Sequence, residues 1–230
     1  MHLFYQKLLK EKIFSLENEE YRHCVQVLRH KEGDVVYVTD GKGLRCEVIL
    51  TRVAKNECHF EVKNEEVFPP KPFAVHLAIA PTKQTERMEW LVEKVCELGV
   101  DELTFVWTQN SERSKLKLDR LEKKSISALK QSKGAWITKL NPPVDLDTFA
   151  RQDDAAIRLV AAVQAGNAYM GDCLVAGQKT SILIGPEGDF TMEEVGKLKA
   201  YQPVSLGQKI LRTETAGVVA CSFVNFVNSY

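Results

Sequence analysis

The 230-residue sequence lacks the features that mark a metal-binding, secreted or membrane-spanning protein. Its six cysteines are scattered and include no Cys-x-x-Cys pair, which argues against a zinc site and against disulfides. No apolar run approaches the ~20 residues of a membrane span. The N-terminus also lacks the apolar stretch and small-residue cleavage site of a secretory signal. We therefore expect a cytoplasmic protein with no membrane segment and no metal.

The sequence also has no excess charge and no familiar nucleotide-binding motif. The formal net charge is zero, so a nucleic-acid partner would have to be met by local basic patches. There is no Gly-x-Gly-x-x-Gly after a strand, no P-loop, no His-Glu-x-x-His and no serine elbow. With 44% apolar and 27% charged residues, the composition is that of an ordinary globular protein.

The first 70 residues have the alternation and turn signals of short strands. We expect a helix over residues 19–28, then strands over residues 34–40, 44–53 and 59–62. Gly41-Lys42-Gly43 would be a hairpin turn between two of these strands. This part of the chain is predicted to be a small β-barrel, residues 1–70, and the proline-rich segment 69–72 to be a linker.

From residue 71 to residue 230 the pattern changes to alternating strands and helices, which predicts a parallel sheet in an α/β domain. The predicted strands cover residues 75–80, 103–107, 157–163, 181–184 and 204–206. The predicted helices cover residues 85–98, 118–132 and 212–227, and the second of these is basic.

An apolar run that ends in a glycine–proline loop is the first candidate for a ligand site. Residues 182–184 suit a buried parallel strand, and GPEG follows directly at 185–188. The two glycines let another molecule approach the backbone closely. Thr191 and Glu194 then have the spacing of a capping box, so a helix begins there. Ligands of open α/β sheets bind at such loops, although a plain turn is the alternative.

A second loop of the same kind follows the next strand. In SLGQKILRTETAG, residues 205–217, a short strand ends, a glycine loop follows and a helix begins near Thr213. Glu214 falls in the first turn of that helix, where a carboxylate is favourable. Two such loops at the carboxyl edge of one sheet favour a single binding crevice over two unrelated turns.

GPEGDF and SLGQKILRTETA resemble segments of the RsmE family of SPOUT methyltransferases. HCVQVLRHKEGDVVYVTDGKG, ERMEWLVEKVCELGVDEL with TQNSERS, and KQS at residues 130–132 are also similar, so the resemblance covers the whole chain. The usual loop is GPEGGF, and here Asp189 replaces a glycine. The KQS element often carries Glu where this chain has Lys130. Neither departure removes a backbone amide from the loop.

The resemblance implies S-adenosylmethionine-dependent methylation of N3 of a uridine in the 16S rRNA of the small ribosomal subunit. It implies a PUA-like RNA-binding barrel, residues 1–70, and a SPOUT α/β domain, residues 71–230, with a parallel sheet and a trefoil knot. It further implies a homodimer with the active site near the subunit interface.

The resemblance places the cofactor among three loops at the carboxyl ends of strands. Backbone groups would read the adenine edge, and apolar side chains would enclose the ring. The implied cofactor-binding residues are Val163, Gln164, Ile184, Gly185, Pro186, Glu187, Gly188, Ser205, Leu206, Gly207, Ile210, Leu211, Thr215 and Ala216.

Arg212 and Glu214 are the candidate catalytic pair. Uridine N3 must lose its proton as or before it attacks a methyl group, so positioning and a general base would both contribute to the rate. Arg212 would stabilise negative charge on the uracil oxygens. Glu214 would orient Arg212 or accept the proton. The alternative is that the two residues only form a salt bridge at the helix start.

Local basic clusters are the candidate RNA contacts. The residues assigned to RNA binding are Arg22, Arg29, Arg113, Lys130, Gln131 and Ser132. A solvated helix face is the alternative for the basic helix.

Two other functions compete with methyl transfer. A non-catalytic RNA-binding or ribosome-assembly protein would use the same barrel and basic helix but would not bind S-adenosylmethionine. An enzyme of a phosphorylated nucleotide would require a phosphate-binding glycine motif, which the sequence lacks.

Overall fold

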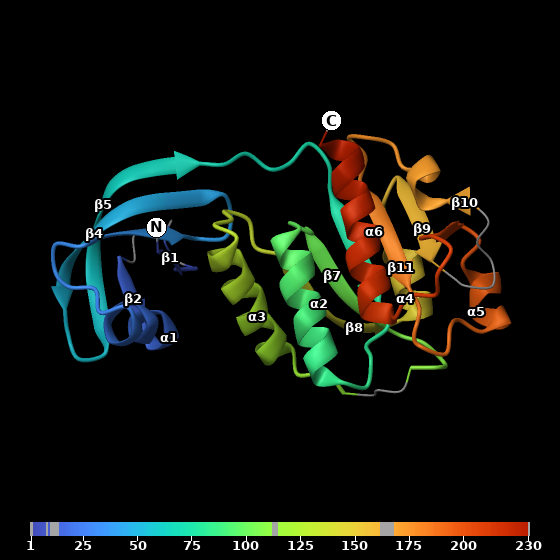
Figure 1. Cartoon of the computed structure of the whole chain (residues 1–230), viewed down its shortest axis with the longest axis horizontal. Helices are drawn as coiled ribbons and strands as arrows, with labels where there is room; N and C mark the ends of the chain where they lie inside the picture. The colour runs from blue at the N-terminus through green and yellow to red at the C-terminus, as the bar shows by residue number, and fades with distance from the viewer. Residues whose placement is uncertain (1, 8, 10–13, 112–114, 162–167, 230) are drawn as a thin grey trace. The chain divides into compact units, whose positions relative to one another are not determined.

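The computed structural model describes residues 2–7, 9, 14–111, 115–161 and 168–229 (Figure 1). They divide into two units. The first is Met1–Pro70 together with Ile126–Ile137, and the second is Lys71–Ser125 together with Thr138–Tyr230. The helix α3 (Leu118–Gln131) crosses the division, so its last turns pack with the first unit.

The first unit is built on a curled five-stranded sheet in the order β1-β3-β4-β5-β2. Its strands are β1 (Leu3–Tyr5), β2 (Ser15–Glu17), β3 (Val35–Thr39), β4 (Leu44–Val53) and β5 (Glu57–Val67). All neighbours are antiparallel except β1 and β3. Register shifts in the β4–β5 ladder bend the two longest strands, and side chains alternate in and out along β4. The predicted small barrel is confirmed as a half-barrel around its own apolar core.

Local chemistry explains the turn and the helix of this unit. The Oδ1 atom of Asp40 accepts hydrogen bonds from the backbone N–H groups of Lys42 (2.7 Å) and Leu44 (3.0 Å), which closes the predicted hairpin. The predicted single helix is wrong in detail. A short α-helix, α1 (Asn18–Tyr21), passes into a π-helical segment, Arg22–Val27, and the apolar spacing of the sequence does not distinguish the two.

The second unit holds a seven-stranded sheet in the order β10-β12-β9-β11-β6-β7-β8, and every neighbouring pair is parallel. The strands are β6 (Val75–Ile79), β7 (Glu102–Trp107), β8 (Lys139–Asp145), β9 (Ile157–Ala161), β10 (Ala168–Tyr169), β11 (Thr180–Ile184) and β12 (Gln202–Ser205). The chain runs outward from β6 to β8 and then returns to the other side of β6. Such a reversal creates a crevice at the carboxyl ends of the strands.

Helices cover both faces of this sheet. On one face, α2 (Thr85–Glu97) packs against α6 (Thr213–Asn228), and Gly217 lets α6 lie against Ile79 and Leu91 (Figure 1). On the other face, α4 (Leu146–Gln152) and α5 (Met192–Lys197) contribute to a second apolar cluster. The predicted parallel α/β domain is therefore confirmed.

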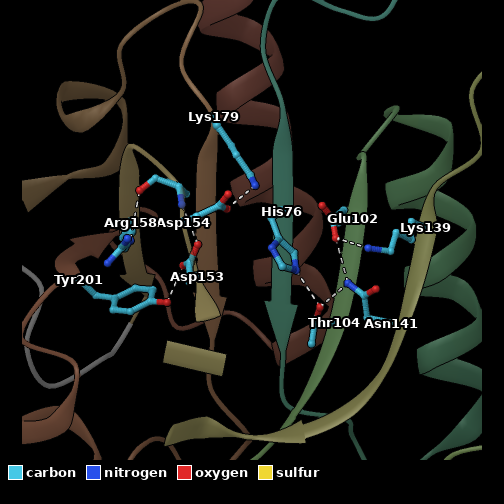
Figure 2. Close-up of polar contacts among 11 residues, drawn as sticks. His76, Glu102, Thr104, Lys139, Asn141, Asp153, Asp154, Arg158, Lys179 and Tyr201 are labelled. Carbon is cyan, nitrogen blue, oxygen red and sulfur yellow. Dashed lines mark hydrogen bonds and ion pairs between the residues drawn. The ribbon is translucent and has the colours of Figure 1, made fainter. Parts of the chain in front are cut away.

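A polar row interrupts the second face near the amino ends of its strands (Figure 2). The Nε2 atom of His76 lies 2.7 Å from Oγ1 of Thr104, and the amide of Asn141 donates to Thr104 (2.9 Å) and Glu102 (3.1 Å). The hydroxyl of Tyr201 donates to Asp153. These bonds satisfy polar groups that the sheet would otherwise bury without partners.

Candidate active site

Three strands of the second unit end side by side and form one cavity. Strand β9 lies between β11 and β12, so the segments that follow these three strands meet at the carboxyl edge of the sheet. The cavity has a volume of about 760 Å³. Its wall includes Ala161 at the end of β9, the residues after β11 and the continuous segment 204–213. The predicted single crevice is present.

The GPEG loop is closely packed and is hydrogen-bonded to neighbouring segments. Ile184 ends β11 with its carbonyl accepting from the N–H of Ala80 (3.0 Å). A Cβ atom at Gly185 would lie only 2.9 Å from the ring of Phe190. The amide of Asn110, after β7, donates to the carbonyls of Gly188 (3.1 Å) and Asp189 (2.9 Å). The loop is therefore fixed in place before any ligand binds.

The helix that follows the loop begins as the sequence predicts. The side chain of Thr191 accepts from the N–H of Glu194, and the carboxylate of Glu194 accepts from the N–H of Thr191, which is a complete capping box. The other oxygen of Glu194 accepts from the N–H of Gln109 (2.8 Å). The cap thus also ties the loop after β7 to the start of α5.

The second loop joins the first through the start of α6. The hydroxyl of Thr213 donates to the carbonyl of Gly185 (3.2 Å). The hydroxyl of Ser205 donates to the carbonyl of Gly207, whose φ is +138°, a conformation that favours glycine. Ile210 is 82% exposed at the cavity, which leaves an apolar side chain open to a ligand.

Most of the predicted cofactor residues line this cavity. They are Ile184, Gly185, Pro186, Glu187, Ser205, Leu206, Gly207, Ile210, Leu211 and Ala216. Gly188 and Thr215 are not among the lining residues. Val163 and Gln164 lie outside the described residues.

The predicted catalytic pair is not joined in the structure. Arg212 lines the cavity and is exposed, and within the described part of the chain it has no ion pair. Glu214 is buried behind the wall, and its Oε1 lies 3.6 Å from Nε of Arg87. The salt bridge proposed between Arg212 and Glu214 is absent, because the carboxylate is turned toward α2 instead.

Arg87 is the main residue of the cavity that sequence reasoning missed. It lies in the first turns of α2, lines the cavity and also donates from Nη1 to Glu187 (2.6 Å). Lys83 and Gln84, just before α2, and Lys209 complete the polar wall. The resembling segment ERMEWLVEKVCELG contains Arg87, but nothing in its helical pattern indicates that the side chain faces a loop about a hundred residues away.

The predicted RNA-binding residues occupy different environments. Arg22 and Arg29 are exposed in the first unit, and Arg29 has a left-handed φ of +60°. Lys130 forms an ion pair of 2.5 Å with Glu20, whereas Gln131 and Ser132 are exposed. Arg113 lies outside the described residues.

Neither a group of metal ligands nor a membrane-spanning helix is found among the described residues. In the described ranges, no three His, Cys, Asp or Glu side chains are grouped as metal ligands would be. The same ranges contain no helix with the length and apolar character needed to cross a membrane.

Comparison with known proteins identifies both units. Residues 69–225 match the model of the RNA methyltransferase domain, and residues 16–63 match that of the RNA methyltransferase PUA domain. A solved structure described as a probable rRNA-methyltransferase from Porphyromonas gingivalis is 39% identical, with a TM-score of 0.93 over 100% of this chain and 99% of the other.

Two further relatives carry a specific name. Ribosomal RNA small subunit methyltransferase E from Neisseria gonorrhoeae, solved bound to S-adenosyl methionine, is 25% identical with a TM-score of 0.86, over 99% of this chain and 98% of the other. The protein of the same name from Bacillus subtilis is 27% identical over 98% of this chain and 96% of its own length.

The parallel α/β unit with a ligand cavity at its carboxyl edge, joined to a half-barrel, defines the class of RNA-modifying enzymes. Because the family model covers most of the chain, this protein belongs to the RNA methyltransferase family, and the PUA unit accompanies the catalytic domain.

Proposed function

We propose that the protein transfers the methyl group of S-adenosylmethionine to N3 of a uridine in 16S rRNA of the small ribosomal subunit. The observation that carries the proposal is the single cavity shared by the GPEG loop and residues 205–212 in a member of this family. Relatives that cover the whole chain and are named small subunit methyltransferase E support the choice of RNA.

The cavity has the properties that the cofactor requires. Its volume of about 760 Å³ lies within the usual range for small-molecule sites. Leu206, Ile210 and Leu211 offer apolar surface for an adenine ring, and the glycine loops offer backbone groups for its polar edge.

Calorimetric titration with S-adenosylhomocysteine tests the cofactor assignment. We expect saturable binding near one site per chain, and no comparable binding of ATP or NAD, because the loops contain no phosphate-binding motif. A folded protein that bound no S-adenosylhomocysteine would favour the alternative of a non-catalytic RNA-binding protein.

When bound, S-adenosylmethionine supplies an electrophilic methyl group on a sulfonium. N3 of the uracil would lose its proton to a base and use the freed electron pair to form the N3–CH₃ bond. The S–CH₃ bond would break with its electron pair left on sulfur, which gives S-adenosylhomocysteine. Arg212, which is exposed at the cavity wall as Lys83 and Lys209 are, would stabilise negative charge on the uracil oxygens during this step.

The role of Glu214 needs a separate test because its carboxylate is buried beside Arg87. As the proton acceptor, Glu214 would be indispensable for turnover even when the protein is saturated with cofactor. We expect Glu214→Gln to lower kcat by about 100-fold, the usual range for loss of a general base. Unchanged turnover on the native substrate would exclude Glu214 as the base.

The substrate assignment is tested with RNA that lacks the modification. Methyl transfer from labelled cofactor to small-subunit rRNA, followed by nuclease digestion and mass spectrometry, should yield 3-methyluridine at a single position. Methylation on a ribose oxygen, or of tRNA alone, would contradict the proposal.

The proposal extends to assembly and location. The protein would act in the cytoplasm as a homodimer, with a trefoil knot in the α/β domain, as the family resemblance implies. Trp90 on α2 and Phe226 on α6, on helices that pack together, expose apolar surface suited to a subunit contact. Sedimentation equilibrium should give twice the chain mass of 26.0 kDa, and a monomeric active enzyme would contradict this part.

A further inference from the structure

Arg87 connects two acidic residues that come from separate parts of the cavity wall. Its Nη1 atom donates to Oε1 of Glu187 in the GPEG loop at 2.6 Å. Its Nε atom lies 3.6 Å from Oε1 of Glu214 in the first turn of α6. One guanidinium on α2 therefore contacts the GPEG loop and the first turn of α6, which directly follows the second loop of the cavity.

The Glu214 contact differs from an ordinary surface ion pair because the carboxylate is buried. The side chain of Glu214 is 8% exposed and that of Arg87 is 24% exposed. The second carboxylate oxygen, Oε2, is buried and has no hydrogen-bond partner among the described residues. Removing the cation would leave a buried carboxylate without its ion-pair partner, with only the N-terminus of α6 to favour its charge, which costs more than losing a surface pair.

The contact with Glu187 restrains the part of the GPEG loop that the side chain of Asn110 does not contact. Asn110 binds the carbonyls of Gly188 and Asp189, at the far end of the loop. Glu187 itself is exposed, so Arg87 supplies the restraint on this residue. The loop is thereby fastened from α2 on one side and from the segment after β7 on the other.

We propose that Arg87 is a positioning residue of the methyl-transfer site. By holding Glu187 and Glu214 on one guanidinium, it keeps the GPEG loop and the first turn of α6 in the relative position that the cofactor requires. This inference rests on the proposed function, since the same cavity is taken as the S-adenosylmethionine site.

The role requires the shape of arginine as well as its charge. The planar guanidinium presents several N–H donors in fixed directions and reaches two carboxylates at once. The ammonium of a lysine is a point charge on a flexible stem and would satisfy one carboxylate at a time. Arg87→Lys should therefore retain only part of the function, with the buried Glu214 favoured as the partner.

The first experiment measures affinity for S-adenosylhomocysteine and thermal stability in Arg87→Gln. We expect affinity to fall about tenfold or more, the range for a lost charge-assisted contact, together with a lower melting temperature. Arg87→Lys should fall between the wild type and Arg87→Gln. Wild-type affinity in a folded Arg87→Gln protein would overturn the proposal.

A double variant separates positioning from simple stabilisation. In Arg87→Gln/Glu214→Gln no buried charge lacks a partner, so the melting temperature should recover toward the wild-type value. The affinity for S-adenosylhomocysteine should stay low, because the GPEG loop is still unfastened from α2. Recovery of affinity together with stability would show that Arg87 acts only through stability.

A matched control comes from the same helix. Glu89 of α2, whose side chain is 10% exposed, pairs with Arg120 of α3, and neither residue lines the cavity. Arg120→Gln should lower the melting temperature and leave the affinity for S-adenosylhomocysteine unchanged. Equal losses of affinity in Arg120→Gln and Arg87→Gln would contradict a specific role for Arg87.

The outcome also distinguishes this inference from the proposed function. If the wild-type protein binds no S-adenosylhomocysteine, the proposed function itself fails. If the wild type binds and methylates while the Arg87 variants match it, only the positioning role fails.

Discussion

Asp189 shows how a single residue adapts to a position that suits glycine. Its φ of +59° lies in the left-handed region, which costs most side chains about 1–2 kcal/mol. Its own carboxylate accepts a hydrogen bond from the N–H of Phe190 (2.8 Å), and aspartate is among the residues that tolerate this region through such local bonds. Aspartate therefore fits the backbone conformation that this position requires.

Two substitutions at this position test that explanation. Asp189→Ala keeps the Cβ atom but loses the local hydrogen bond, so we expect a loss of about 1 kcal/mol in the free energy of unfolding. Asp189→Gly removes the local hydrogen bond and also the backbone strain, so its free energy of unfolding should stay within about 0.5 kcal/mol of the wild-type value. Urea denaturation measures both, and a larger loss in the glycine variant would contradict the argument.

A substitution at Gly185 should affect ligand binding, because the ring of Phe190 already occupies the space that a side chain would need. A Cβ atom there would lie 2.9 Å from the ring of Phe190, so the loop would have to shift. We expect Gly185→Ala to weaken binding of S-adenosylhomocysteine by about tenfold or more, since small displacements in a preformed site are costly. Gly196→Ala on α5, where a Cβ atom meets nothing within 4 Å, is the control and should bind normally.

At the scale of elements, the polar row in the sheet makes stability depend on pH. Burial lowers the pKa of His76 from its ordinary value of 6.5, and the nearby Lys179 and Lys139 act in the same direction while Glu102 and Asp153 oppose it. The folded protein therefore holds this imidazole neutral below the pH at which the unfolded chain takes up a proton. Stability from this group is present above pH 6.5 and is lost as the pH falls below it.

The variant His76→Gln isolates this contribution. Glutamine is neutral at every pH and keeps a polar group opposite Thr104, so the fall in stability below about pH 6.5 should become shallower. The pKa of His23 in the other unit is also lowered, mainly by burial, so the slope should be reduced and not abolished. Denaturant titrations at several pH values measure it, and an unchanged slope would exclude His76.

Some strands and helices can be predicted from the sequence and others cannot. The strand 44–53 agrees with the prediction at both ends, because its alternation is strong. The helices α2 and α3 begin at the predicted residues, Thr85 and Leu118, and each ends one residue before its predicted end. β8 was missed because Pro142 and Pro143 lie inside it. A proline is tolerated there because β8 is the last strand of the sheet and one of its edges is unpaired within the described sheet.

At the scale of the whole molecule, the sequence predicted the two loops of the cavity but not the contact that joins them. The glycines of both loops have a local signature, and the family resemblance assigned their role. Arg87 lies about a hundred residues before Glu187, and only the packing of α2 against α6 brings it to the cavity. For the same reason Glu214 was assigned to its sequence neighbour Arg212 rather than to Arg87. The trefoil knot and the homodimer stay predictions.

RNA binding is a prediction about the first unit, to which Arg29 and Lys130 both belong. If phosphate contacts dominate, the logarithm of the binding constant should fall linearly with the logarithm of salt concentration, by about 0.7–0.9 for each contact. Arg29 is exposed and has a left-handed backbone conformation, which asparagine tolerates. Arg29→Asn therefore removes the charge without straining the backbone, and it should reduce the salt slope by about one. Lys130 already neutralises Glu20 at 2.5 Å, so Lys130→Gln should change the slope less.

Filter binding of a small-subunit rRNA fragment across a salt series distinguishes the two residues. A larger change for Lys130→Gln than for Arg29→Asn would mean that RNA displaces Glu20 from Lys130 and that the basic helix is the main contact. Equal slopes in the wild type and both variants would mean that neither residue meets a phosphate. In that case the exposed Arg22 of the π-helical segment would be the next substitution, because it lies in the same unit without the constraint of a left-handed backbone.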